Sequence, residues 1–270
     1  MARIQIGTDS IYYQACGYAD TMVPSEIAVV FIHGSGGSHK SWPTQIRSTW
    51  IRSMGAQSIR NISAYLLDLP GHGQSTGKGM ETIDAYADFI DEFVSVMSLR
   101  QVVLAGHSLG GAISLQLALR QPVWLAGLVL VGTGARLRVH PDILDQVRKN
   151  HEKTTDLICR WAFGPDASEE LIEGSKRALL KTSPEVAWGD FSACSAFDVV
   201  SRLGNIKVPS LIVSAADDAL TPPKYGRFLN NEIENSQYCL IKRAGHMMAI
   251  EKPDEFLAGL TMFLSKLSEI

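Results

Sequence analysis

Short apolar segments that alternate with longer amphipathic ones predict most of the secondary structure of this chain. The clearest of them, at residues 27–32 and 125–131, lack the polar alternation of a strand with one exposed face. Because such strands alternate with helical segments, we expect an α/β fold with a mostly parallel central sheet of about eight strands and helices on both faces. The strands are predicted at residues 27–32, 64–69, 101–105, 125–131, 210–214 and 237–242.

Further elements are predicted near the two ends of the chain and between the strands. Residues 3–7 and 11–15 alternate in polarity on either side of a polar turn, which is typical of a hairpin. Residues 42–54 and 82–97 are predicted helices, and Thr82, the first residue of the second, has the side chain of an N-cap. Residues 253–270 predict a C-terminal amphipathic helix, because their apolar side chains fall on one side.

One region interrupts the alternation of strands and helices. Residues 137–205 show helical periodicity without a convincing strand, and we interpret them as a helical cap. The core domain would then consist of residues 1–136 and 206–270. Ordinary crossover helices are the alternative, although a crossover usually needs only one helix. The helical segments are predicted at residues 141–149, 154–163, 168–180 and 184–203.

Composition narrows the class of protein. The chain has 270 residues, of which 46% are hydrophobic, and its net charge of −3 gives no basic excess of the kind that nucleic acids require. No apolar run reaches the roughly 20 residues that span a bilayer, and the N-terminus lacks the apolar core of a secretory signal. We therefore expect no membrane span and a cytoplasmic location. The four cysteines are scattered, without a C-x-x-C pair, which indicates reduced thiols.

The first chemical motif is Gly106-His107-Ser108-Leu109-Gly110, which lies between a predicted buried strand and a strongly apolar helix. Glycines two positions before and after a serine leave room for the crowded backbones of a sharp strand-to-helix turn. Such a turn holds the serine in a strained conformation at the positive end of the helix. We therefore predict that Ser108 is a nucleophile.

A second glycine-rich turn, His33-Gly34-Ser35-Gly36-Gly37, follows the strand at residues 27–32. Glycines allow backbone N–H groups to face a developing oxyanion without obstruction by side chains. The expected donors are the amides of Ser35 and of Leu109, which directly follows the predicted nucleophile. A phosphate-binding loop is the alternative, but the chain has no G-x-x-x-x-G-K-[ST] pattern.

A serine hydroxyl needs a base that removes its proton. Among the seven histidines, His246 follows the last predicted strand in a loop that can overhang the strand ends, so it is the best candidate. The side chain of His107 should leave the elbow in a different direction. His33 and His72 precede glycines in turns, where structural hydrogen bonding is expected. The remaining candidates in the predicted cap, His140 and His151, are expected on the surface.

The acid that holds the base in the correct tautomer should follow a neighbouring strand. The predicted strand at residues 210–214 runs into Asp217 and Asp218, and either aspartate satisfies the chemistry. The order Ser108, Asp218, His246 along the chain is that of α/β-hydrolases.

From about residue 27 to the C-terminus, the sequence resembles the α/β-hydrolase superfamily, in the branch with a small helical cap. Members usually carry the acid in G-x-x-D-x-[hydrophobic]-[T/V]-P, which aligns Asp218 with the catalytic position, although Ala215 replaces the usual glycine. The resemblance implies that residues 68–75 brace the active-site face and that neither a metal nor an organic cofactor is needed. It rests on four separated motifs: His33-Gly34 with Trp42 downstream, residues 68–75 (DLPGHGQS), residues 106–111 (GHSLGG), and Gly245-His246 followed by residues 251–256 (EKPDEF).

The resemblance also implies an activity. A carboxylesterase would hydrolyse a small to medium ester with water, through an acyl group on Ser108. A carbon–carbon bond hydrolase of vinylogous diketones, a thioesterase or lactonase, and a non-enzymatic receptor on the same fold are alternatives. Diketone substrates usually carry carboxylates, for which Arg136, Arg138 and Arg160 are candidate partners. The sequence does not indicate an oligomeric state.

Aromatic side chains of the predicted cap are candidates for the substrate pocket, because binding sites are mostly apolar. Trp161 and Trp188 are candidates together with His107, and Phe163 and Phe191 have the same character. For the cap aromatics we favour the other interpretation, a packed core of the cap, because buried aromatic side chains usually serve packing.

Overall fold

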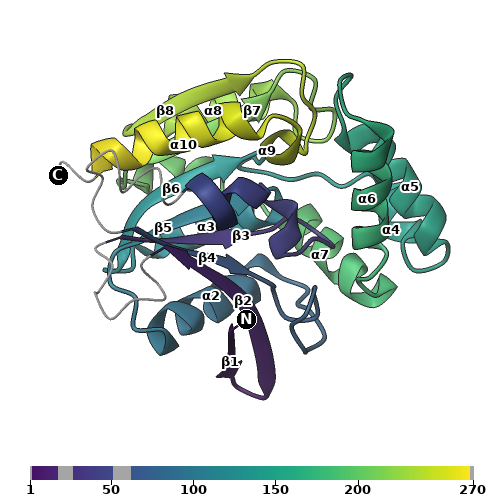
Figure 1. Ribbon diagram of the computed structural model, residues 1–270, viewed down its shortest axis with the longest axis horizontal. Helices are drawn as coiled ribbons and strands as arrows, with labels where there is room; N and C mark the ends of the chain where they lie inside the picture. The colour runs from purple at the N-terminus through teal and green to yellow at the C-terminus, as the bar shows by residue number, and fades with distance from the viewer. Residues whose placement is uncertain (1, 18–26, 51–61, 268–270) are drawn as a thin grey trace.

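The computed structural model describes residues 2–17, 27–50 and 62–267, and for residues 49 and 50 it describes the backbone alone. Its centre is an eight-stranded sheet in the order β1-β2-β4-β3-β5-β6-β7-β8 (Figure 1). β1 and β2 form an antiparallel hairpin, β2 pairs antiparallel with β4, and the pairs from β4 to β8 are parallel. The strands are β1 (Ala2–Ile6), β2 (Asp9–Gly17), β3 (Ile27–Ile32), β4 (Ile62–Leu67), β5 (Val102–His107), β6 (Leu125–Val131), β7 (Ser210–Ala215) and β8 (Ser236–Ile241).

Helices cover both faces of the sheet, because the central strands bury side chains on both sides. In β3, Ala28, Val30 and Ile32 join the apolar cluster that contains α2 and α3. The alternate residues Val29 and Phe31 join a second cluster that contains α10. This period of two is the geometry of a strand, and it explains why the central strands read as continuous apolar runs. The helices outside residues 137–205 are α2 (Ile83–Val96), α3 (Leu109–Arg120), α8 (Pro223–Glu232), α9 (Met248–Glu251) and α10 (Pro253–Leu267).

Residues 141–196 form helices that stand together at one side of the sheet (Figure 1), whereas the 3₁₀-helix at residues 200–205 contacts α3 and α8. Two of them begin at serine N-caps, Ser168 and Ser183, whose hydroxyls accept a hydrogen bond from an amide in the first turn. Asp198 makes an isolated bridge with Arg136, so the chain after α7 returns to the point where this segment begins. The helices are α4 (Pro141–Gln146), α5 (His151–Ala162), α6 (Glu169–Leu179), α7 (Pro184–Ala196) and the 3₁₀-helix η4 (Val200–Asn205).

Some elements differ from the expectations. The helix predicted at residues 42–54 is represented by the short η3 (Ile46–Trp50), and residues 51–54 lie outside the described residues. The segment predicted at residues 184–203 is divided, because Phe197 adopts an extended conformation after α7. α8 and α9 were not predicted. Within the described residues, no helix is long and apolar enough to cross a membrane.

Candidate active site

Ser108 occupies a sharp turn between β5 and α3. Its backbone lies at φ 52° and ψ −112°, a strained region for a residue with a side chain. A Cβ on Gly106 would collide with the backbone of Gly110, and one on Gly110 would collide with the carbonyl of Ile32. The glycines of the motif are therefore required by close backbone contact, as the sequence indicated.

Asp218 and His246 meet at the ends of neighbouring parallel strands. Asp218 follows β7 and His246 follows β8, and the carboxylate Oδ2 lies 2.9 Å from Nδ1 of the imidazole. Thr221 orients the carboxylate, because its hydroxyl donates to Oδ2 at 2.7 Å and its amide donates to Oδ1 at 2.8 Å. Asp217 is exposed, and its amide donates to the carbonyl of Ala244. Of the two aspartates, Asp218 is the one in contact with the histidine.

The environment of Asp218 favours its charged form. Burial raises the pKa of this carboxyl, but His246, through its charge and hydrogen bond, and the hydrogen bonds from Thr221 hold the pKa below its usual value. An ionised carboxylate accepts a hydrogen bond from the Nδ1–H group and leaves Nε2 of His246 as the basic nitrogen. This is the tautomer that a general base beside a serine needs.

Ser108 and His246 line one cavity of about 650 Å³. The described residues show no hydrogen bond between Oγ of Ser108 and Nε2 of His246. In enzymes without substrate this contact is often long and tightens when substrate binds. His107 also lines the cavity, and its Nε2 donates to the carbonyl of His246 at 3.0 Å. Burial lowers the pKa of His107 to about 3, so a neutral imidazole holds the His246 loop.

The turn after β3 brings Ser35 to the same cavity. Neither the Ser35 amide nor the Leu109 amide has a hydrogen-bond partner among the described residues, and Leu109 is the first residue of α3. His33 shapes the turn, because its Nδ1 donates to the carbonyl of Gly34 and its Nε2 accepts from the amide of Leu69. Burial, followed by the charge of His72, lowers the pKa of His33 to about 4, which matches a neutral ring with these two roles.

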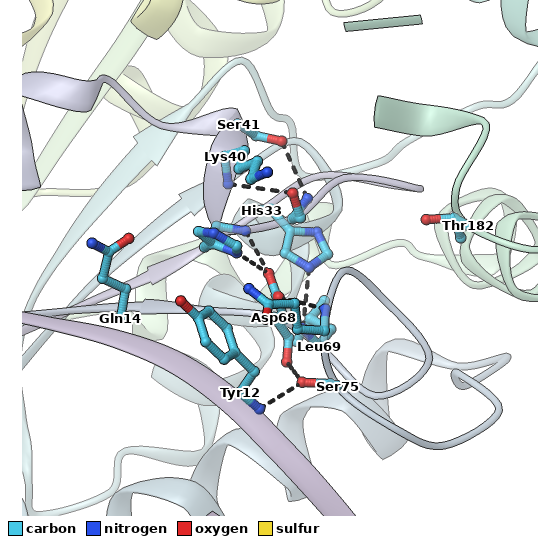
Figure 2. A network of polar contacts seen from close by, with 12 residues as sticks. Tyr12, Gln14, His33, Lys40, Ser41, Asp68, Leu69, Ser75 and Thr182 are labelled. Carbon is cyan, nitrogen blue, oxygen red and sulfur yellow. Dashed lines mark hydrogen bonds and ion pairs between the residues drawn. The ribbon is translucent and has the colours of Figure 1, made fainter. Parts of the chain in front are cut away.

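Asp68 is the centre of a separate buried network (Figure 2). Its carboxylate accepts from the His39 amide at 2.6 Å, lies 2.8 Å from the His39 ring and accepts from the Gln74 amide. Ser75 donates its hydroxyl to the Asp68 carbonyl and accepts from the Tyr12 amide in β2. These contacts tie the turn after β4 to the turn after β3 and to the hairpin, whereas Ser108 and His246 are not among the partners of Asp68.

The aromatic residues proposed for the pocket divide into two groups. Phe163 and Phe191 line the cavity, and Trp161 and Trp188 do not. The Trp161 ring lies edge-on to His140, and the Trp188 ring stacks under the guanidinium of Arg148, 3.6 Å from the ring centroid. The structure therefore does not bring these two tryptophans to the cavity that Ser108 lines, and helix periodicity alone does not reveal which side of a helix faces the core.

The charged residues near the cavity also differ from the candidates. Among the described residues that line the cavity, Lys40 is the one basic side chain of the Lys or Arg type and Glu170 is the one acidic side chain. The candidate arginines lie elsewhere. Arg136 pairs with Asp198, and Arg160 pairs with Asp156 on the surface of α5. No cluster of three or more potential metal ligands occurs among the described residues.

Three polar residues at this site were missed by sequence reasoning. Thr221 holds Asp218, and its place before a proline in the acid motif was the available signal. Glu251 accepts from the amides of Gly164 and Gly245, which ties the His246 loop to the end of α5. Asp190 accepts from the amide of Gly36 in the turn after β3. The signal for Asp190 was a lone acid in an otherwise apolar part of its helix.

The mostly parallel sheet and the strand-to-helix elbow that carries Ser108 are the features of the α/β-hydrolase fold. Residues 29–259 match the alpha/beta hydrolase family, so the chain belongs to that family.

Relatives in this family are esterases and related hydrolases. The chain is 27% identical to the putative carbamate hydrolase RutD of Agrobacterium fabrum, over 94% of this chain and 98% of the relative. It is 25% identical to the pimeloyl-[acyl-carrier protein] methyl ester esterase of Nitrosospira multiformis, over 96% and 99% of the two chains. The solved structure of a thermophilic esterase is 32% identical, with a TM-score of 0.81 and coverage of 98% and 97%.

Proposed function

We propose that this protein is a serine esterase that cleaves a carboxylic ester of small to medium size through an acyl-enzyme intermediate. The observation that carries the proposal is the meeting of Ser108, His246 and Ser35 at one cavity, with Asp218 hydrogen-bonded to His246. The names of the relatives support ester or carbamate hydrolysis as the chemistry.

In the proposed reaction, Oγ of Ser108 attacks the ester carbonyl while Nε2 of His246 takes the hydroxyl proton. The amides of Ser35 and Leu109 donate to the resulting oxyanion. Collapse of the tetrahedral intermediate breaks the ester C–O bond, and His246 returns the proton to the departing alcohol. His246 then takes a proton from water, whose oxygen attacks the acyl carbon, and the carboxylic acid and the free Ser108 are released. Asp218 keeps its charge throughout and stabilises the imidazolium form of His246.

The lining of the cavity indicates the character of the substrate. Ile158 of α5, Leu171 of α6 and Phe191 of α7 contribute apolar surface, and Leu220 and Ile250 contribute from the core side. Such a lining favours an uncharged acyl or alcohol group. We also propose that residues 137–205 serve as a cap, because α5, α6 and α7 cover the cavity from this segment. A dicarboxylate diketone is less well matched, since Lys40 is the one Lys or Arg side chain in the described lining.

The test is hydrolysis of p-nitrophenyl esters of increasing acyl length by the wild type and by Ser108→Ala. We expect wild-type turnover and a loss of at least about 10⁴-fold in kcat for the variant. Ser175→Ala is the matched control, because Ser175 lines the same cavity from α6 and has no place in the mechanism. It should retain wild-type kcat.

Phenyl carbamates, thioesters and vinylogous diketones form the second arm of the same assay. Preference for a carbamate or thioester would keep the acyl-enzyme mechanism and change the substrate. Folded wild-type protein without turnover on any of these compounds would contradict the proposal and favour a ligand receptor.

A further inference from the structure

Asp190 is a fully buried carboxylate on α7, within the proposed cap. It accepts three hydrogen bonds from three other parts of the chain. The Gly36 amide donates to Oδ2 at 2.8 Å, and the Tyr86 hydroxyl of α2 donates to Oδ1 at 2.5 Å. Nε2 of His72, in the turn after β4, also lies 2.8 Å from Oδ2. Burial of a carboxylate is costly unless it is paired and hydrogen-bonded, and here both conditions hold.

The partners of His72 show that this pair is ionic. Nδ1 of His72 lies 3.0 Å from the Pro70 carbonyl, which can only accept, so Nδ1 carries a proton. Nε2 faces a carboxyl group whose two oxygens already accept, Oδ1 from Tyr86 and Oδ2 from Gly36, so we assign a proton to Nε2 as well. Burial lowers the pKa of His72, but the charge of Asp190 and the hydrogen bond to it outweigh burial and raise the pKa above its usual value. An imidazolium therefore neutralises the buried carboxylate.

Gly36 is held on both sides by residues of the proposed cap. Its amide donates to Asp190, and its carbonyl accepts from the Thr182 hydroxyl at 2.9 Å. Gly36 has φ +66°, a conformation that residues with side chains rarely adopt. The Gly36 N–H belongs to the same peptide group as the Ser35 carbonyl, so the bond to Asp190 fixes the direction in which the backbone leaves Ser35.

We propose that Asp190 is a positioning residue for the oxyanion hole and that it holds the Ser35 amide in place through the Gly36 peptide. The inference rests on the proposed function, because it assigns a role to the Ser35 amide in ester hydrolysis. Asp190 does not touch the reacting atoms in this account. It acts on the transition state by keeping one donor of the oxyanion hole aligned.

Asp190→Asn is the direct variant, because it preserves volume and removes the charge. An amide at this position cannot neutralise the His72 imidazolium, and it loses one of the two acceptor oxygens. A small displacement of a group that stabilises the transition state can cost about 10²-fold. We expect kcat to fall roughly 10-fold to 100-fold, with KM changed by less than about threefold.

Two further variants keep the inference falsifiable if Asp190→Asn fails to fold. Thr182→Val removes only the hydroxyl that donates to the Gly36 carbonyl, and it should lower kcat by roughly threefold to 10-fold. Glu185→Gln is the matched control, since Glu185 is an exposed acid on the same helix α7. It should retain wild-type kcat and KM.

A trifluoromethyl ketone provides a readout that loss of stability alone would not change. Oγ of Ser108 adds to its carbonyl carbon, His246 takes the proton, and the hemiketal oxygen becomes an oxyanion in the oxyanion hole. For Asp190→Asn and Thr182→Val, the inhibition constant should rise by the same factor by which kcat/KM falls. The comparison is made with folded protein, at a temperature well below the Tm of each variant.

The outcomes separate the inference from the proposed function. An active wild type with unchanged kcat and inhibition constants in both variants would overturn the role of Asp190 and leave the esterase proposal intact. A fall in kcat without the parallel rise in the inhibition constant would also overturn it. A wild type that hydrolyses no ester and does not bind the ketone would overturn both.

Discussion

Two buried aspartate–histidine pairs lie on opposite sides of the Ser108 elbow. The distance between the carboxylate oxygen and the imidazole nitrogen is nearly the same in both. In one pair, Asp218 lies 2.9 Å from Nδ1 of His246. In the other, Asp190 lies 2.8 Å from Nε2 of His72. All four residues are at most 5% exposed. A short contact between a carboxylate and an imidazole therefore does not distinguish a catalytic pair from a structural one.

The second nitrogen of each imidazole makes the distinction. In His72, Nδ1 donates to the Pro70 carbonyl, so both nitrogens are occupied and the ring has no site for a further proton. In His246, Nε2 has no hydrogen-bond partner among the described residues, and the residue lines the cavity with Ser108. A third pair, His39 and Asp68, lies in the buried network of Figure 2 and has no place in that cavity. What a general base needs is an open nitrogen beside a nucleophile.

The largest difference in kcat between the two pairs should follow from substitution of their histidines. His246→Gln removes the proposed base, and we expect a loss of about 10⁵-fold or more in kcat. His72→Gln leaves the base in place, and we expect kcat to fall by no more than about 100-fold, through the oxyanion turn. Single-turnover hydrolysis of a p-nitrophenyl ester measures both. Equal losses in the two variants would remove the distinction between the pairs.

The next largest difference in kcat should follow from neutralisation of the two carboxylates. Asp218→Asn should lower kcat by about 10⁴-fold, because the amide stabilises the wrong tautomer of His246. Asp190→Asn should lower it by no more than about 100-fold. Steady-state kinetics at matched protein concentrations measure the ratio. If Asp190→Asn proved the more damaging of the two, the oxyanion turn would matter more than the proposed acid.

The free energy of unfolding should depend more on the His72–Asp190 pair than on the His246–Asp218 pair, which is the opposite of the order expected for kcat. His72→Gln leaves the Asp190 charge buried without its counterion, which should lower the free energy of unfolding by about 3 kcal/mol. His246→Gln leaves Asp218 with its hydrogen bonds from Thr221 and should cost less. Urea denaturation of both variants tests this order. A His72→Gln variant as stable as the wild type would show that His72 is not charged.

The pH dependence of this stability has a definite sign. The pKa of His72 is raised in the folded protein, so its contribution is complete below the ordinary value of 6.5 and is lost as pH rises through the folded pKa. The stability advantage of the wild type over His72→Gln should therefore be larger at about pH 6 than at about pH 9. Tyr86, Asp68 and His33 also face this pair, and these three side chains are unchanged in the comparison. An advantage that grew with pH would contradict the imidazolium assignment.

The lowered pKa values of His33 and His107 affect the pH dependence of stability in the opposite direction to the raised pKa of His72. Both rings are neutral in the folded protein, and the unfolded chain takes up protons more readily below about pH 6.5. Stability should therefore fall as pH decreases from about 6.5 towards the folded-state pKa values of about 4 for His33 and about 3 for His107. His107→Asn should reduce this acid sensitivity, because it removes one neutral imidazole. Thermal melts between about pH 4 and pH 7 measure the effect.

Local patterns predicted the parts of the molecule that depend on neighbouring residues. The continuous apolar runs gave β3 and β6 with the bounds that the structure shows. The glycine spacing around Ser108 gave the elbow, because those glycines are required by contacts within the same turn and strand pair. Thr82 predicted the start of α2 as an N-cap residue, and in the structure its hydroxyl accepts a hydrogen bond from the Ala85 amide.

Contacts between distant segments were not predictable in the same way. Asp190 and His72 are 118 positions apart, and nothing near either residue encodes the other as its partner. Trp161 and Trp188 were candidates for the pocket because their apolar surface fits both a pocket and a packed helix. Only the tertiary position of α5 and α7 shows that they contact His140 and Arg148 instead.

In the proposed reaction Ser108 carries the acyl group, and covalent labelling can detect that group on the protein. Wild type, Ser108→Ala and Ser175→Ala would be treated with a fluorophosphonate and also quenched in acid during ester turnover, followed by peptide mass spectrometry. We expect a phosphonyl or acyl adduct on the peptide that contains Ser108 in the wild type and in Ser175→Ala, and none in Ser108→Ala. Turnover without an adduct on Ser108, or an adduct that persists in Ser108→Ala, would contradict the proposed reaction.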